Sequence, residues 1–167
     1  PSHQLNAYYN GIWGKTTIDL NTDLYFSTNR AYAYSDEQSQ EHDSRNINSK
    51  NRVSNKMVAT KLVITSPLLG GNLSYGAEYI NTHRNDDYEV NRTDLLANSY
   101  SKLEEQTASP FIQYARLTPI GNITAGLRYE YVRFKYYDAG IYQPEQSRSF
   151  RNLFPTISYG AKIGKVM

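Results

Sequence analysis

The sequence contains no cysteine and no long hydrophobic run, and these absences narrow the classes of protein to consider. Without cysteine there can be no disulfide framework, no thiolate zinc site and no cysteine nucleophile. No stretch of about 18 apolar residues occurs, so no transmembrane helix is expected, whereas membrane-spanning β-strands escape this test because their side chains alternate. No basic and apolar leader follows Pro1, so we expect any signal peptide to lie outside these residues.

The sequence also lacks a large surplus of either charge sign, and it lacks the common catalytic motifs. The 18 basic and 16 acidic residues are interspersed and leave a net charge of +2, which argues against a nucleic-acid partner. No HExxH, GxSxG or Walker-type pattern occurs, so we expect no enzymatic activity, no catalytic residue, no metal site and no cofactor. His3, His42 and His83 lack ligand spacing and are expected to be solvated loop residues. Asp86-Asp87 and Glu104-Glu105 could bind a cation weakly, but as neighbours in polar loops they are expected to be solvated charges.

Aromatic residues are abundant, in contrast. The chain has 39% hydrophobic and 13% aromatic residues, and 16 of its 167 residues are tyrosine. Tyrosine has an apolar ring and a polar hydroxyl, so such a surplus suits surfaces that are half wet and half apolar, such as membrane interfaces or binding faces.

The clearest periodicity in the sequence is two. Between residues 17 and 26, Ile18, Leu20 and Leu24 alternate with polar residues, which predicts a strand with one apolar and one polar face. Residues 122–135 repeat this pattern over a length that exceeds the usual 5 to 6 residues of soluble strands. The same reasoning predicts an all-β, antiparallel up-and-down meander of about seven long strands, at residues 5–12, 17–26, 58–65, 73–79, 110–117, 122–135 and 152–163.

The expected connections alternate in length. Short turns that carry glycine or proline fall at residues 12–15, 66–72 and 118–122, and long polar connections are expected at residues 29–55, 83–108 and 137–151. Tight turns at one end and extended loops at the other are typical of outer-membrane barrels. We therefore predict that residues 1–167 form part of a transmembrane β-barrel domain.

The alternation predicts where polar and aromatic side chains point. If the apolar face contacts lipid, the polar residues of the same strands face the lumen, because Lys or Arg on the lipid side at the midplane costs about 2 to 4 kcal/mol. The predicted lumen-facing residues are Asp19, Asn21, Asp23, Lys61, Glu78, Arg128 and Glu130. A hydrated lumen wall without a ligand role is the simpler interpretation of this set. Aromatic residues near the strand ends predict interfacial girdles formed by Trp13, Tyr25, Phe26, Tyr79, Tyr131 and Phe134. Tyrosines of the expected loops suit external recognition of sugars or proteins: Tyr32, Tyr34, Tyr88, Tyr100 and Tyr142.

An ordered set of strand motifs resembles the outer-membrane β-barrel family related to TonB-dependent receptors. The motifs are ATKLVITSPL at residues 59–68, IQYAR at 112–116, AGLRYEY at 125–131 and NLFPTIS at 152–158, and the likeness starts at LNAYYNG, residues 5–11. Each motif alone is degenerate, but their order and spacing also match, over nearly the whole chain.

The resemblance implies a 22-stranded barrel with an N-terminal plug domain, located in the Gram-negative outer membrane. It also implies import of a large ligand, driven by an inner-membrane energising complex. We expect this chain to be an interior slice of such a barrel, without the plug, the TonB-contacting box, the signal peptide or the final C-terminal strand.

Two other interpretations of the alternating strands stay open. The chain could be a soluble β-sandwich or lipocalin-like ligand-binding module, in which the apolar faces form the core. It could also be a small closed barrel of about eight strands that acts as an adhesin or porin. Because seven strands cannot close as a simple antiparallel meander, we expect the isolated segment to expose two edges and an apolar face, and to self-associate in water.

Overall fold

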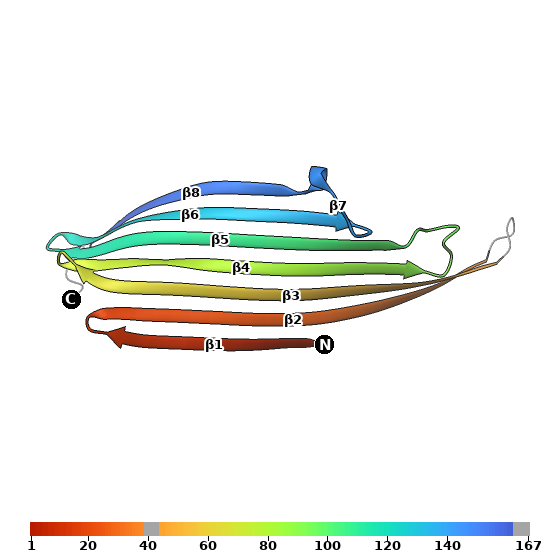
Figure 1. The fold of residues 1–167 in the computed structure, drawn as a ribbon, viewed down its shortest axis with the longest axis horizontal. Helices are drawn as coiled ribbons and strands as arrows, with labels where there is room; N and C mark the ends of the chain where they lie inside the picture. Colours follow the sequence, from red (N-terminus) through yellow and green to blue (C-terminus); the bar gives the residue numbers. More distant parts are fainter. Residues whose placement is uncertain (39–43, 162–167) are drawn as a thin grey trace, which may run out of the picture.

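One antiparallel sheet contains nearly all of the chain (Figure 1). The computed structural model describes residues 1–38 and 44–161. Seven long strands and one short strand form the sheet, and a single 3₁₀ turn, η1, covers Pro144–Gln146. The strands are β1 (Ser2–Trp13), β2 (Thr16–Glu37), β3 (Arg45–Leu68), β4 (Gly71–Val90), β5 (Ser99–Thr118), β6 (Gly121–Asp138), β7 (Ile141–Tyr142) and β8 (Arg148–Gly160).

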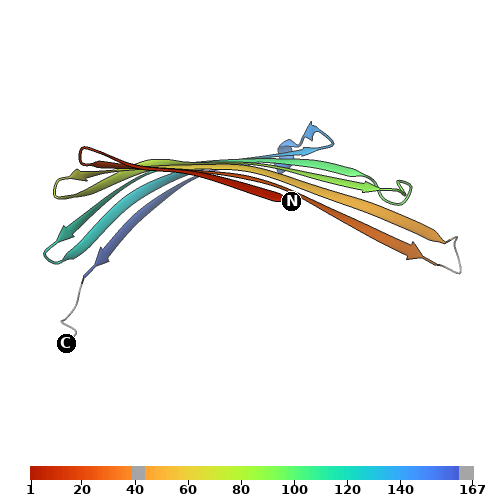
Figure 2. The ribbon, with the colours of Figure 1, turned by 90° about the horizontal axis from the view of Figure 1, so that it is seen from below.

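The strands pair in chain order, as the meander prediction requires. β1 to β6 form consecutive antiparallel pairs, and β6 then pairs with both the two-residue β7 and the long β8. The predicted all-β fold of about seven long strands is therefore confirmed. The sheet is arched along its strands and does not close on itself, so β1 and β8 form its two edges (Figures 1 and 2). No helix in the described part of the chain is long and apolar enough to cross a membrane.

The short turns lie together at one end of the sheet, and the β4–β5 connection and β7 lie at the other (Figure 1). Leu69 and Gly70 join β3 to β4 with φ angles of 47° and 75°. Positive φ at both central residues defines a type I′ turn, whose twist matches that of the flanking strands. The predicted turns at residues 12–15, 66–72 and 118–122 are thus confirmed in position.

The strands are longer than predicted, and the long polar connections are correspondingly shorter. Residues 29–37, 45–55, 83–90, 99–108, 137–138 and 148–151 were expected in loops but belong to strands, which leaves connections at 91–98 and at 139–147, the second of which contains β7 and η1. The prediction was wrong because it required an apolar face, whereas a backbone ladder continues wherever both strands stay extended, even with polar side chains on both faces. His3 and His83 therefore lie inside β1 and β4, and His42 lies outside the described residues.

The sheet has almost no core of its own. Among the described residues, Val90 is the one buried hydrophobic side chain. Large apolar side chains of the middle strands stay exposed, for example Ile112 at 49% and Leu127 at 41%. An apolar face that none of the described residues covers must meet another apolar medium or surface.

Candidate functional site on the polar face

The strand register brings the seven predicted polar residues to one face of the sheet. Asn21 pairs with Lys61, and Lys61 pairs with Glu78, so these three side chains form one row across β2, β3 and β4. Side chains of directly paired residues point to the same face, as do those of residues i and i+2 along a strand. Asp19 and Asp23 flank Asn21 on this face. A neighbouring row runs from Asp19 through Val63, Gly76 and Phe111 to Arg128, and Glu130 follows Arg128 on β6.

A hydrogen-bond network covers the β1–β2 part of this polar face. The hydroxyl of Tyr8 donates to the carboxylate of Asp19 at 2.8 Å, and the amide of Asn10 donates to the same oxygen. Asn6 donates to both Asn21 and Asp23 at 2.7 Å. These β1 partners were not among the predicted polar residues, although their alternation with Leu5, Ala7 and Tyr9 is a signal of the same kind.

An ion-pair cluster covers the β4–β6 part. The guanidinium of Arg128 lies 3.2 Å from Glu78 and 3.7 Å from Glu130, with side chains between 27% and 40% exposed. Ser109, which pairs with Glu78 on the intervening β5, is fully buried, and its hydroxyl has no hydrogen-bond partner among the described residues. In this part of the polar face one cation thus lies within ion-pair distance of two carboxylates.

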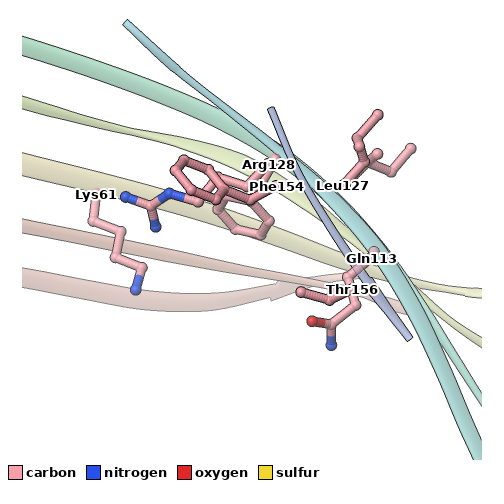
Figure 3. Close-up of a pocket in the computed structure, with 9 residues that line it drawn as sticks. Lys61, Gln113, Leu127, Arg128, Phe154 and Thr156 are labelled. Atoms are coloured by element: carbon pink, nitrogen blue, oxygen red, sulfur yellow. The ribbon is translucent and has the colours of Figure 1, made fainter. Parts of the chain in front are cut away.

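A shallow hollow of about 270 Å³ lies beside these charges (Figure 3). Lys61 and Arg128 line it together with Phe111 and Phe154, and Figure 3 shows Leu127 pointing away to the opposite side of the sheet. Lys61 takes part in none of the ion pairs in the described part of the chain. The hollow thus offers two cationic groups next to apolar rings.

The predicted aromatic girdle residues divide between the two faces. Four of them lie on the apolar face, as the strand register shows: Trp13, Phe26, Tyr79 and Tyr131. Their paired neighbours are Thr16 for Trp13, His3 and Lys56 for Phe26, Thr60 for Tyr79, and Ala108 for Tyr131. Tyr25 and Phe134 share one row of the polar face, through Met57, Thr82 and Glu105. The structure therefore does not place these two rings with the other four.

Two pairs of adjacent acidic residues could have held a cation, but the two side chains of each pair lie on opposite faces of the sheet. Asp86 and Asp87, like Glu104 and Glu105, are successive strand residues whose side chains point to opposite faces. The carboxylate of Asp86 forms an ion pair with Arg84 at 3.2 Å, and that of Glu104 forms an ion pair with Lys102 at 2.6 Å. Within residues 1–38 and 44–161, no group of three or more His, Asp or Glu side chains could hold a metal ion.

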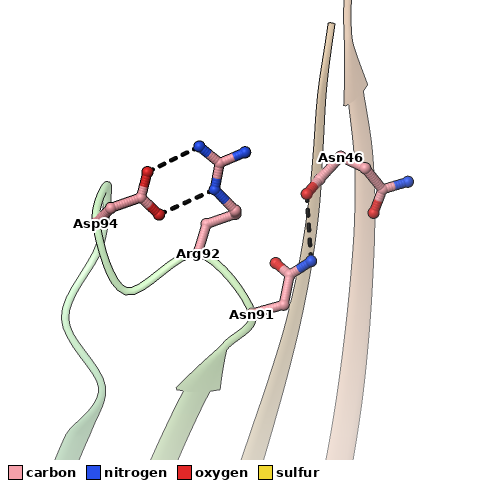
Figure 4. A network of polar contacts seen from close by, with 4 residues as sticks. All are labelled: Asn46, Asn91, Arg92 and Asp94. Carbon is pink, nitrogen blue, oxygen red and sulfur yellow. Dashed lines mark hydrogen bonds and ion pairs between the residues drawn. The ribbon is translucent and has the colours of Figure 1, made fainter.

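The long-connection end carries its own polar contacts (Figure 4). The amide of Asn91 donates to the backbone carbonyl of Asn46 at 3.2 Å, which ties the β4–β5 connection to β3. Arg92 donates two hydrogen bonds to Asp94, at 2.9 and 2.7 Å, and this lowers the pKa of the Asp94 carboxyl to about 2. Four of the five tyrosines expected in loops lie instead in the outer parts of long strands, namely Tyr32, Tyr34, Tyr88 and Tyr100, whereas Tyr142 lies in the two-residue strand β7 within the connection at 139–147.

Comparison with known proteins identifies the fold. The sequence profile of the Outer membrane protein beta-barrel family matches residues 14–166, and this match confirms the family resemblance and the outer-membrane localisation inferred from the sequence. The sheet is similar to part of the copper transporter OprC, with a TM-score of 0.65 at 11% identity over 98% of this chain and 27% of that one. It is also similar to the unliganded ferric citrate transporter FecA, with a TM-score of 0.54 at 10% identity over 93% of this chain and 23% of that one. The chain thus spans about a quarter of these structures, and no curated protein sequence matches it.

Proposed function

The chain belongs to the outer membrane protein β-barrel family, and from this premise we propose that residues 1–167 form part of the barrel wall of a TonB-dependent import receptor. Its apolar face contacts lipid, and its polar face lines the lumen. The partners are then membrane lipid, a plug domain and an inner-membrane energising complex, and the role is transport without catalysis. The similarity in fold to transporters of copper and of ferric citrate supports this proposal.

The observation that carries the proposal is the separation of side chains by the strand register. Leu20, Leu62 and Ala77 form one row, and the adjacent row on the other face is Asn21, Lys61 and Glu78. A soluble sandwich would cover the apolar row with a second sheet, whereas here the single sheet leaves it open. Lipid supplies the missing apolar contact without any further protein.

The length of the apolar band fits a membrane. On β6 the apolar face runs from Ile123 through Leu127 to Tyr131 and then meets Arg133. A tilted strand needs about 9 to 11 residues to cross the hydrocarbon layer. Tyr79 and Tyr131 lie at the same level as Arg151, at the end of the band near the long connections, and Trp13 lies at the turn end. These positions suit aromatic side chains at the headgroup level.

The polar face would contact water and the plug. The predicted lumen-facing residues carry more negative than positive charge. Four of them are acidic, Asp19, Asp23, Glu78 and Glu130, and two are basic, Lys61 and Arg128. Lys61 and Arg128 beside Phe111 form a spot suited to an acidic side chain with an apolar neighbour. We place the plug contact at this hollow.

Spin labels on β6 test which face meets lipid. Single cysteines from position 123 to 131 of the full-length protein, labelled and placed in vesicles, should show oxygen accessibility that peaks at 123, 125, 127 and 129. Accessibility to a water-soluble nickel complex should have the same period in the opposite phase, with maxima at 124, 126 and 128. Oxygen accessibility that shows no alternation, or that has its maxima at 124, 126 and 128, would overturn the proposal.

Photocrosslinking tests the lumen and the plug together. A photoreactive residue at position 61 should crosslink within the same polypeptide, to a segment outside the barrel, whereas the same residue at position 62 should crosslink to lipid. Crosslinks to lipid from position 61, or a full-length protein without a plug-like segment, would remove the receptor assignment.

A further inference from the structure

Three cationic residues gather on the apolar face, where its band of hydrophobic side chains ends. Arg133 and Lys135 follow Tyr131 at every second position of β6, so they share the face of Leu127 and Tyr129. Arg151 on β8 pairs with Tyr131 and lies diagonal to Arg133, which pairs with Ser149. Residues i and i+2 of a strand are about 7 Å apart, and diagonal neighbours about 7 to 8 Å. We call Arg133, Lys135 and Arg151 the boundary cluster.

The charges of the boundary cluster are poorly neutralised. Gln106 and Ser149, the two neighbours that pair with Arg133, are uncharged. Lys135 pairs with Glu104, but that carboxylate lies 2.6 Å from the ammonium of Lys102 and 3.7 Å from His83. The described residues contain no ion pair that includes any of the three cluster residues. Glu130 lies next in sequence to Tyr131 but points to the other face, where it contacts Arg128.

The cluster is also open to its surroundings. Arg133 and Arg151 are exposed, and Lys135 is partly exposed. The guanidinium of Arg151 lies 5.8 Å from the centre of the Tyr131 ring, which holds it at the end of the band. Arginine presents donors in a fixed fork that matches the oxygens of a phosphate, and Gln106 and Ser149 add neutral donors beside it.

The cluster marks one end of the apolar band. It lies on the side of the long connections, and Lys56 on β3 is at the same level, in the row that also contains His83, Glu104 and Lys135. At the turn end of the same face β5 carries Arg116, which pairs with Ile123. Positive charge on this face is therefore concentrated at the leaflet beside the long connections, where headgroup phosphates would surround it.

We propose that Arg133, Lys135 and Arg151 form a binding site for the phosphate of an anionic lipid headgroup in the leaflet on the long-connection side. This inference depends on the proposed function, because it requires the apolar face to contact lipid. The site lies on the outside of the barrel wall and takes no part in binding the imported ligand.

The test measures the lipid that stays bound to the full-length protein. Protein is reconstituted in phosphatidylcholine vesicles with or without phosphatidic acid, extracted in mild detergent and analysed for retained phosphatidic acid. The triple substitution Arg133→Gln, Lys135→Gln, Arg151→Gln should lower retention about a hundredfold, which is about fivefold for each charge removed. Arg116→Gln, on the same face at the other end of the band, should leave it unchanged. The double substitution Arg133→Lys, Arg151→Lys keeps all three charges and should keep most of the wild-type retention.

Each outcome decides the inference. Equal retention by wild type and the triple variant, both inserted and both heat-modifiable on gels, would overturn the headgroup site and leave the barrel assignment intact. Inorganic phosphate that displaces the retained lipid at equal phosphate concentration would also overturn it, because the site would then bind phosphate without the lipid. If wild type itself fails to insert, the proposed function fails, and the inference fails with it.

Discussion

The guanidinium of Arg128 on β6 lies 3.2 Å from the carboxylate of Glu78 on β4, so this ion pair crosses the intervening strand β5. The buried Ser109, which pairs with Glu78, lies on the strand beneath it. The same guanidinium is 3.7 Å from Glu130, so one cation serves two carboxylates. The pair therefore links β4 to β6 through side chains, across the strand β5 with which both form backbone hydrogen bonds.

The coupling between Arg128 and Glu78 should be measurable but small. Both side chains are partly exposed to solvent, at 40% and 27%, so a double-mutant cycle with Arg128→Met and Glu78→Gln should give about 0.2 to 1 kcal/mol. The measurement is the free energy of unfolding of the full-length protein in vesicles. The cycle of Arg128→Met with Glu89→Gln, a distant carboxylate, serves as control and should give no coupling. A coupling energy of zero for the first cycle would contradict a structural role for this pair.

Neighbouring residues on β5 should respond oppositely to a new charge. Ile112 lies on the apolar face and pairs with Leu127, at the middle of the apolar band, whereas Gln113 lies on the polar face. Ile112→Arg should lower the free energy of unfolding in vesicles by about 2 to 4 kcal/mol, because it puts a cation at the bilayer midplane. Gln113→Arg should change it by less than about 0.5 kcal/mol. Similar losses for both variants would show that both faces are wet or that both are packed.

Gly76 should not tolerate a side chain. It lies between Val63 and Phe111, and an added Cβ would collide with the backbone carbonyl oxygen of Leu62. Gly76→Ala should therefore destabilise the barrel by about 1 to 3 kcal/mol, since backbone must move. At Gly126, in the same face, the nearest atom is the hydroxyl of Thr156 at 2.9 Å, which can rotate away. Gly126→Ala should cost clearly less, and equal costs in thermal unfolding would count against the backbone argument.

The alternation of side chains was sufficient to predict the strand order, the short turns and the shared face of Asp19, Lys61 and Arg128. Hydrophobic periodicity determines these features directly, because a slip of one residue would move every apolar side chain to the wrong face. The outer halves of β2 and β3 escaped prediction for the same reason. Around Tyr32 and Asn48 both faces are polar, so the ladder continues without a periodic signal.

The contacts of the polar face could be predicted only in part. The row of Asn21, Lys61 and Glu78 depends on the register between strands, and the register is set by the turns, which the sequence marks with glycine. The ion pair of Arg128 with Glu78 skips a strand and depends on side-chain length and direction, which no spacing rule contains. Alternation alone puts Tyr25 and Phe26 on opposite faces of the sheet. The girdle prediction grouped them together because it considered only their nearness to the strand end.

Acid should loosen the β4–β5 connection only at very low pH. Arg92 lowers the pKa of Asp94 from its ordinary value of 3.8 to about 2, so the folded connection holds this proton less tightly than the unfolded chain. The contribution of this contact is complete above about pH 3.8 and is lost as the pH falls through about 2. Amide exchange at Leu95 and Leu96, whose N–H groups donate to the carbonyl of Arg92, reports it. Arg92→Gln should move the loss of protection to higher pH, and an unchanged midpoint would contradict the assignment.

The isolated segment of residues 1–167 should self-associate in water. Its edge strands expose large apolar side chains, with Ile157 at 83% and Leu5 at 64%, together with unpaired backbone groups. Sedimentation velocity should show oligomers that bind a hydrophobic dye and dissociate in detergent. Ile157→Lys puts a charge on the apolar face of the edge strand β8 and should weaken association, whereas Ser158→Lys, on the polar face, should not. Because this difference follows from which face is apolar, a stable monomer that binds no dye would show that the apolar face is covered, and a soluble fold would then explain the alternation better than a membrane.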